Sequence, residues 1–109
     1  MSDDQIEDCD CPPNPPPPEG ALTREMPIVN RKGLHARATA KFVQCVENFE
    51  SDVTVSRCGE TVGGMSIMGI LTLGAGKGTT ITVTAVGADA EAALDAIGAL
   101  VANRFGEDE

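Results

Sequence analysis

The segment Gly33-Leu34-His35-Ala36-Arg37 holds the side chains best suited to carry out chemistry in this sequence. His35 is the only histidine among 109 residues, and it stands where a segment with helical spacing begins. The N-terminus of a helix has unpaired N–H donors and the positive end of the helix dipole, so it attracts an anion. An imidazole nucleophile, a guanidinium group and an anion site within this segment predict phosphoryl transfer to and from the histidine.

A lone histidine also has a plainer interpretation, which is an incidental or buried structural residue. The neighbouring Arg37 argues against it, because the helix dipole disfavours a cation in the first turn. A bound phosphoryl group would account for this arginine, since a guanidinium group can donate to two oxygens at once. Without such a group, Arg37 is a solvated first-turn side chain.

Two segments of the chain resemble the two signatures of one family. Residues 33–43, Gly-Leu-His-Ala-Arg-Ala-Thr-Ala-Lys-Phe-Val, resemble the active-site signature of HPr, the histidine-containing phosphocarrier of the bacterial phosphotransferase system. Residues 66–79, Ser-Ile-Met-Gly-Ile-Leu-Thr-Leu-Gly-Ala-Gly-Lys-Gly-Thr, resemble the regulatory-serine helix of the same family and the turn after it. The similarity covers about residues 24–106 and leaves the N-terminal segment unmatched.

The resemblance implies a role for each residue of the first signature. His35 would carry the phosphoryl group on Nδ1, and the backbone N–H groups of Ala36 and Arg37 would contact its oxygens together with the Arg37 guanidinium. The phosphoryl group would come from an Enzyme I-type protein charged by phosphoenolpyruvate and would pass to an EIIA-type protein. The chain would need no cofactor and would be a protein substrate more than an autonomous enzyme. Ala38 stands where many family members have proline.

Ser66 has one role from its chemistry and a second from the resemblance. Serine is a good N-cap, so Ser66 is expected to begin a short helix. The resemblance adds phosphorylation of Ser66 by an HPr kinase/phosphorylase, and it places a docking patch for partner proteins on Ile67, Met68 and Leu71. Met65 stands where family members often have lysine.

The charge of the chain is unevenly distributed. Of the net −9, residues 1–25 contribute −6 from seven acids and one base, residues 26–106 are neutral with seven of each sign, and residues 107–109 contribute −3. The chain has no surplus of basic residues, and this argues against nucleic acid as a partner. The bases expected around the site should instead meet acidic faces of partner proteins; they are Arg31, Lys32, Arg37, Lys41 and Lys77.

Three regions follow from composition. Six of the seven prolines lie in residues 12–18, so residues 1–22 are expected to form a disordered, acidic, proline-rich arm. A ligand for polyproline-binding modules is the alternative. The resemblance implies a phosphocarrier domain over residues 23–106, and residues 107–109 are expected to form an acidic tail. The arm includes Cys9 and Cys11, but no second ligand pair completes a metal site there.

The start of the chain has neither a signal-peptide pattern nor an apolar run long enough to span a membrane. We therefore expect a cytoplasmic, monomeric protein without membrane insertion. In that compartment the four cysteines are expected to be thiols and not disulfides.

Periodicity predicts an α+β fold. Alternation predicts strands over residues 24–30, 52–57, 60–62 and 79–86, with Cys58-Gly59 as a two-residue turn. Helical spacing predicts helices over 36–48, over 67–73 and over 89–104, the last with Asp89 as N-cap. The order β-α-β-β-α-β-α is typical of a two-layer sandwich, and the resemblance implies an open-faced one, with four antiparallel strands and three helices on one face.

Two other functions remain to be weighed. One is a regulatory binding module of the nitrogen-related phosphotransferase branch, controlled at Ser66. The other is a nucleotide-binding enzyme built on the glycine loop of residues 74–79. The Walker pattern requires glycine and serine or threonine where this loop has Leu71 and Gly78, so the loop is expected to be a turn.

Overall fold

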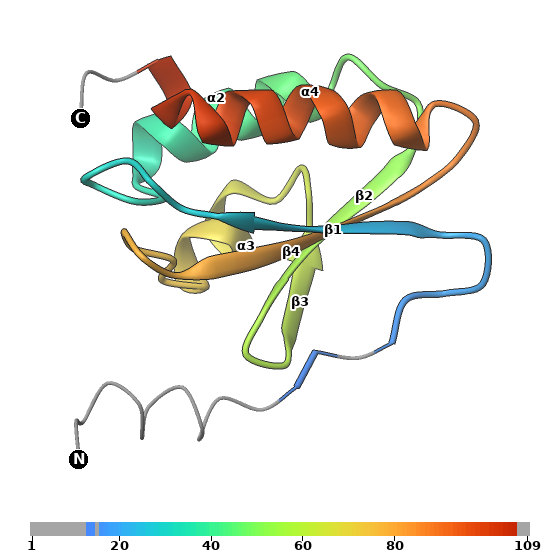
Figure 1. Cartoon of the computed structure of the whole chain (residues 1–109), viewed down its shortest axis with the longest axis horizontal. Helices are drawn as coiled ribbons and strands as arrows, with labels where there is room; N and C mark the ends of the chain where they lie inside the picture. The colour runs from blue at the N-terminus through green and yellow to red at the C-terminus, as the bar shows by residue number, and fades with distance from the viewer. Residues whose placement is uncertain (1–12, 15, 107–109) are drawn as a thin grey trace.

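The computed structural model describes residues 13–14 and 16–106 of the chain. The four strands form one antiparallel sheet in the order β1-β4-β2-β3. Helices α2 and α4 lie over one face of this sheet, and α3 packs against α2 (Figure 1). The predicted element order and the open-faced α+β sandwich are therefore confirmed. The elements are β1 (Leu22–Pro27), α2 (Ala36–Val46), β2 (Asp52–Arg57), β3 (Glu60–Gly63), α3 (Ile67–Thr72), β4 (Thr80–Val86), α4 (Ala90–Ala102) and the short 3-10 turn η1 (Arg104–Gly106).

The core lies between the sheet and the helices and is built mainly from aliphatic side chains. Along β4, Ile81, Val83 and Ala85 are buried toward the helices, while the intervening threonines face the other side of the sheet. Phe42 of α2 and Phe105 of η1 are the largest fully buried side chains. Burying a side chain of this size contributes roughly 1.5–3 kcal/mol.

β1 begins and ends earlier than its sequence pattern indicates. It covers Leu22–Pro27 and not residues 24–30, and Leu22 already pairs with Ala85 of β4. Pro27 ends the strand because it has no N–H to donate. The chain then turns inward at Ile28, whose N–H donates to the carbonyl of Thr79 over 2.8 Å.

The large side chains of α2 set its buried face. Ala36 is exposed and Ala40 is only partly buried. The large side chain of Phe42 decides the orientation, since it is fully buried whereas an alanine gains little from either face. The helix also ends at Val46, two residues before the predicted end. The buried residues of α2 are Ala38, Thr39, Phe42, Val43 and Val46.

Asp89 occupies the predicted N-cap position of α4, but its side chain does not cap that helix. Its carboxylate accepts hydrogen bonds from the N–H groups of Glu50 and Ser51, both at 2.9 Å, and from the Ser51 hydroxyl. The hydroxyl of Ser51 is the main cause that holds the pKa of Asp89 below its usual value, and the N–H of Glu50 adds to it. Asp89 thus joins the loop after α2 to the loop before α4.

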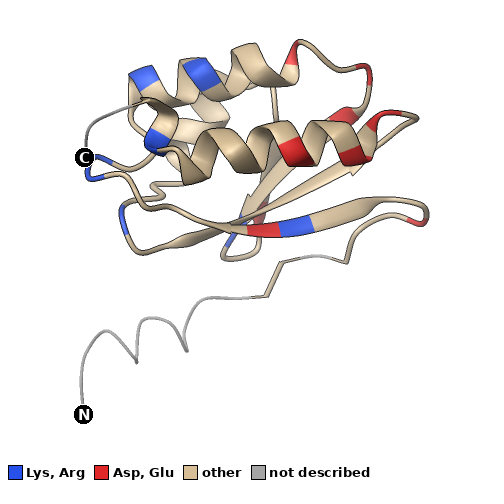
Figure 2. Ribbon diagram, turned by 45° about the horizontal axis from the view of Figure 1, so that its top comes forward, with Lys and Arg blue, Asp and Glu red and all other residues tan. Residues whose placement is uncertain are grey.

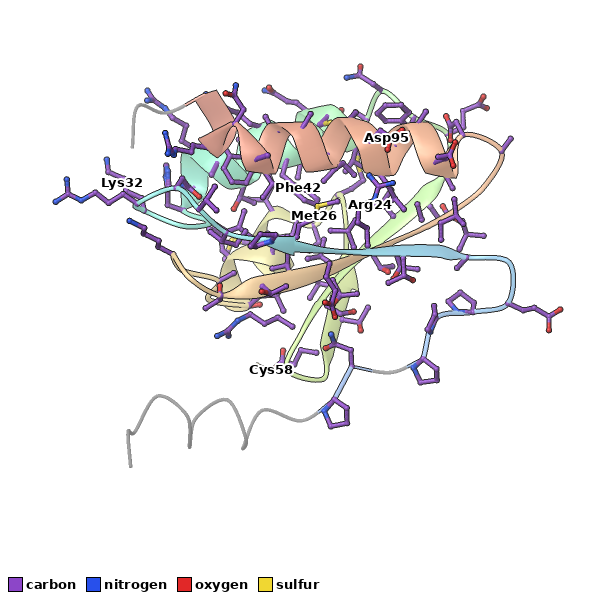
Figure 3. All side chains as sticks on the ribbon, in the orientation of Figure 1. Arg24, Met26, Lys32, Phe42, Cys58 and Asp95 are labelled. Atoms are coloured by element: carbon purple, nitrogen blue, oxygen red, sulfur yellow. The ribbon has the colours of Figure 1, made fainter. Side chains whose placement is uncertain are left out.

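The prediction that all cysteines are thiols is wrong for Cys58. This residue, at the tip of the β2–β3 hairpin with φ +54°, is disulfide-bonded, whereas the partly buried Cys45 is free. The partner of Cys58 lies outside the described residues, where the sequence has Cys9 and Cys11. Figure 3 labels Cys58 at the tip of this hairpin.

One described residue of the arm contacts the open face of the sheet. The side chain of Asn14 donates to the Thr82 hydroxyl over 3.2 Å and accepts from the N–H of Gly59 over 2.9 Å. The arm therefore passes close to the hairpin that carries Cys58. The disordered arm was predicted over residues 1–22, and residues 1–12 and 15 of it lie outside the described residues, as does the acidic tail at 107–109.

Candidate functional site

His35 is the N-cap residue of α2. Its backbone is extended, with φ −80° and ψ −177°, and its carbonyl accepts the first helical hydrogen bond from the N–H of Thr39 over 2.8 Å. The imidazole makes no capping hydrogen bond to the helix and is partly exposed. The N–H groups of Ala36 and Arg37 belong to the first turn, where no intrahelical acceptor is available. The structure thus places the predicted nucleophile beside two backbone donors.

The loop before His35 is held against the glycine turn after α3. The N–H of Leu34 donates to the carbonyl of Ala75 over 2.8 Å. Gly33 adopts φ +67°, and a Cβ at this position would lie 2.5 Å from the Ala75 carbonyl oxygen and 2.6 Å from the Gly76 Cα. Only glycine fits this approach without displacing backbone. The two sequence signatures, which begin 33 residues apart at Gly33 and Ser66, therefore meet in space.

 The hydrogen bond between Leu34 and Ala75, which lie far apart in the sequence, thus fixes the loop that carries His35.

Positively charged residues gather at the end of the molecule that carries His35. Figure 2 shows Lys and Arg mainly at this end of the two long helices and Asp and Glu mainly at the opposite end. Arg31, Lys32, Arg37 and Lys77 are exposed, and Lys32 extends away from the domain (Figure 3). The exception is Lys41, which donates to the carbonyl of Phe105 over 2.6 Å and so fastens η1 to α2.

Ser66 begins α3, as its chemistry predicts. Its hydroxyl accepts a hydrogen bond from the N–H of Gly69 over 3.1 Å, and its side chain remains at the surface. A Cβ on Gly69 would lie 2.8 Å from this hydroxyl, so the glycine leaves room for the cap. At the other end of the helix, the Arg57 guanidinium donates to the carbonyl of Leu73 over 3.0 Å.

The residues of the predicted docking patch lie on the surface of α3 to different degrees. Met68 is 71% exposed and Ile67 is 43% exposed, whereas Leu71 is partly buried. Ile70 is fully buried and Leu73 is nearly so, as their spacing indicates. The structure therefore brings two large apolar side chains to the surface immediately after Ser66. A flexible methionine suits a surface that meets several partners.

Two buried polar residues near His35 were not singled out by sequence reasoning. Asn30 and Thr39 are both fully buried, and each has a side-chain hydrogen bond to the backbone of the loop that contains His35. Neither residue belongs to a pattern that carries chemistry by itself. Asn30 lies in the segment between β1 and α2, and Thr39 lies within α2, so their burial depends on how these elements pack.

The fold and the site together define a class of protein. An open-faced sandwich presents one partly exposed histidine at a helix N-terminus, with cations around it. Such a surface suits a small carrier that passes an anionic group between larger proteins.

The comparisons with known proteins agree with this class. The family model described as the phosphorylation site of the PTS HPr component matches residues 22–103. The phosphocarrier protein HPr of Cupriavidus necator is 51% identical over 88 residues, which cover 81% of this chain and 99% of that protein. The phosphocarrier protein NPr of Shewanella violacea is 42% identical over 86 residues, covering 79% of this chain and 94% of that protein. A crystal structure of HPr from Thermoanaerobacter tengcongensis superposes with a TM-score of 0.77 at 38% identity, covering 81% of this chain and 99% of that one.

The chain belongs to the HPr family of the phosphotransferase system. It is a phosphocarrier of that family, and the resemblance read from its two signatures is confirmed.

Proposed function

We propose that His35 is the residue on which this phosphocarrier accepts its phosphoryl group, from an Enzyme I-type protein, and from which it donates that group to an EIIA-type protein. The observation that supports this most directly is the position of His35 as N-cap of α2, partly exposed and beside the first-turn N–H groups. In each step a ring nitrogen attacks phosphorus and the bond from phosphorus to the donor nitrogen breaks. The phosphoryl group moves whole, so no cofactor or redox step is needed.

The first turn of α2 would hold the phosphoryl group on His35. The N–H groups of Ala36 and Arg37 donate to its oxygens, and the positive end of the helix dipole stabilises its charge. The exposed Arg37 side chain adds a planar pair of donors to the same oxygens. The family resemblance implies Nδ1 as the phosphorylated atom. Because His35 is not enclosed, the next protein can approach the phosphorus directly.

The bases around His35 would select partners with acidic faces. The Lys and Arg residues clustered at this end of the molecule (Figure 2) should raise the association rate with an acidic partner, and this effect weakens as salt screens the charges. The apolar side chains of Ile67, Met68 and Leu71 would supply the uncharged part of the docking surface.

Ser66 would be the regulatory site of the carrier. Its exposed hydroxyl at the start of α3 is accessible to an HPr kinase/phosphorylase. The helix N-terminus tolerates a phosphate there, so the modification should act on docking and leave the fold intact. The new charge would lie directly before Ile67 and Met68 and would repel an acidic partner.

The proposal has two forms, one for the sugar branch of the phosphotransferase system and one for the nitrogen-related branch. Relatives named HPr and a relative named NPr both match the chain over most of its length. A regulatory module of the nitrogen-related branch, controlled at Ser66, is therefore the second candidate. His35 is presented equally well in both, so the donor protein is what distinguishes them.

A nucleotide-binding enzyme has little support from the structure. The glycine loop leads into the strand β4 and not into a helix, so it lacks the helix N-terminus that a phosphate loop requires. A cleft of about 890 Å³ lies between α2, β2 and the start of α3, but Glu47, Glu50 and Asp52 line it. These carboxylates would repel the phosphates of a nucleotide.

The proposal includes action in the cytoplasm as a monomer. None of the helices in the described part of the chain is long and apolar enough to cross a membrane. Disulfides are uncommon in the cytoplasm, so the Cys58 bond is the observation that bears against this location. Thiol trapping in intact cells, followed by size-exclusion chromatography of the purified chain, measures both points.

The function is tested by incubation with phosphoenolpyruvate and Enzyme I, taken in turn from the sugar branch and from the nitrogen-related branch. The wild-type chain should acquire an acid-labile phosphate from one of them, and His35→Ala should acquire none while keeping its circular dichroism spectrum. Arg37→Ala should accept phosphate more slowly, because the backbone donors remain. Arg24→Ala is the matched control, since it removes an equal charge from an ion pair with Asp95 on α4. Equal labelling of His35→Ala and the wild type would overturn the proposal.

A further inference from the structure

Asn30 is a polar side chain buried completely beside the loop that carries His35. Its exposed fraction is 0%, and its Nδ2 donates to the carbonyl of Gly33 over 2.8 Å. The N–H of Gly33 donates in return to the carbonyl of Asn30 over 3.2 Å. The two hydrogen bonds close a turn, with Arg31 and Lys32 exposed at its corner. Burying an amide is costly unless it is hydrogen-bonded, and the bond from Nδ2 to Gly33 offsets part of this cost.

The carbonyl of Gly33 connects Asn30 to His35. The same oxygen accepts a second hydrogen bond, from the N–H of His35 over 3.0 Å. A carbonyl has two lone pairs and can accept both donors. The side chain of Asn30 therefore fixes the orientation of the Gly33 carbonyl, which also accepts the hydrogen bond from the His35 N–H.

Thr39 holds the same loop from the side of the helix. Its hydroxyl donates to the carbonyl of Leu34 over 3.3 Å, and its N–H donates to the carbonyl of His35 over 2.8 Å. The peptide groups on both sides of His35 are thus hydrogen-bonded to residues that are themselves fully buried. The backbone of His35 is therefore rigid, and it holds the imidazole at a defined angle to the first-turn N–H groups.

We propose that Asn30 is a positioning residue for phosphoryl transfer at His35. The inference rests on the proposed function of His35 and goes beyond it, because Asn30 touches neither the imidazole nor the phosphoryl group in this argument. Without its donor, the Gly33 peptide turns more freely, and the imidazole loses its fixed angle to the N–H groups of Ala36 and Arg37. A misplacement of about 1 Å in a reacting group can reduce a rate by about 100-fold.

Two variants remove the donor of Asn30 in different ways. Asn30→Asp keeps size and polarity but offers a carboxylate oxygen to the Gly33 carbonyl, and Asn30→Leu keeps a similar size with an apolar surface. Leu94→Ala is the control, since Leu94 is a buried core residue of α4 whose truncation lowers stability. Two readouts are measured on folded protein: the rate of phosphate acceptance from Enzyme I, and the NMR shifts of the Ala36 and Arg37 amides on phosphorylation.

The proposal predicts that either folded Asn30 variant accepts phosphate about 100-fold more slowly than the wild type and shows reduced shifts at both amides. Leu94→Ala should match the wild type in both readouts despite its lower stability. Wild-type rates and shifts in a folded Asn30 variant would overturn the proposal. If neither Asn30 variant folds, Thr39→Val takes their place, and the same outcomes decide whether the buried frame positions His35.

The design separates this inference from the proposed function. If the wild type accepts no phosphate from either Enzyme I, the proposed function fails, whatever Asn30 does. The NMR signals of the His35 ring in the unphosphorylated protein still report its placement. Ring signals that are unchanged in folded Asn30 variants would then overturn the positioning role by themselves.

Discussion

The N–H of Leu34 donates a hydrogen bond to the carbonyl of Ala75, 2.8 Å away, and this contact joins the loop of His35 to the glycine turn after α3. The neighbouring Gly33 comes so close to the same turn that a Cβ would lie 2.5 Å from the Ala75 oxygen. The placement of the histidine therefore depends on a segment some forty residues later in the chain as well as on its own helix.

Gly33→Ala should destabilise the protein by more than about 1 kcal/mol, because it adds a backbone collision to the cost of a positive φ. Gly74→Ala is the matched control: its φ of +66° is nearly the same as the +67° of Gly33, but a Cβ there meets no atom within 4 Å. Urea unfolding of both variants measures the difference. Equal losses of unfolding free energy would show that the close approach contributes nothing.

Asp89→Asn should lower the free energy of unfolding at neutral pH and have less effect in acid. The hydrogen bonds from Ser51 and Glu50 lower the pKa of Asp89 in the folded state, so the charged carboxylate stabilises the fold above its unfolded pKa of about 3.9. This stabilisation is lost as the pH falls through the lower, folded value. Chemical unfolding across this pH range measures the effect.

Asp95→Asn is the control for that series. It removes an exposed ion pair with Arg24 and should change the unfolding free energy by less than about 1 kcal/mol. A difference between wild type and Asp89→Asn that stays constant from neutral pH through the acid titration of this carboxyl would contradict the account of Asp89.

Ser66→Asp should accept phosphate from Enzyme I more slowly than the wild type at low salt. Aspartate caps a helix as well as serine does, so the slower rate would come from negative charge beside Ile67 and Met68. Ser66→Asn is an equally good cap without the charge and should behave as the wild type. Transfer rates at low and high ionic strength decide the matter, since salt should reduce the defect. Equal rates for all three proteins at low salt would leave Ser66 as a structural cap only.

Alkylation should distinguish the two described cysteines. Cys58 should react only after reduction, because it is disulfide-bonded, whereas Cys45 should react without a reductant. Burial raises the pKa of the Cys45 thiol, so its reaction should speed up as the pH rises toward 9. Peptide mapping after labelling with and without reductant measures both. Labelling of Cys58 in the oxidised protein would contradict the disulfide.

The elements that were well predicted from sequence are those with an unambiguous period. β2 falls on Asp52–Arg57 as its alternation indicates, and the Cys58-Gly59 turn lies where the strand pattern breaks. The start of α2 directly after His35 was also predicted. These features depend on neighbours within a few residues, so local sequence determines them.

The features that sequence reasoning missed depend on contacts between distant segments. The small side chains of Ala36 and Ala40 could not indicate which face of α2 is buried, because packing of Phe42 decides it. Asp89 was read as a cap, although its partners come from a loop nearly forty residues earlier. The role of Asn30 likewise depends on its burial, which its residue type does not predict.

The most direct test of the central claim is a two-step transfer through His35. The chain is phosphorylated by Enzyme I and phosphoenolpyruvate, separated from both, and mapped by tandem mass spectrometry under alkaline conditions. It is then mixed with an EIIA-type protein alone. The account predicts phosphate on His35 at the first step and its quantitative appearance on EIIA at the second. Phosphate on another residue, or phosphate that stays on His35 in the presence of EIIA, would contradict the claim that this chain carries phosphoryl groups through His35.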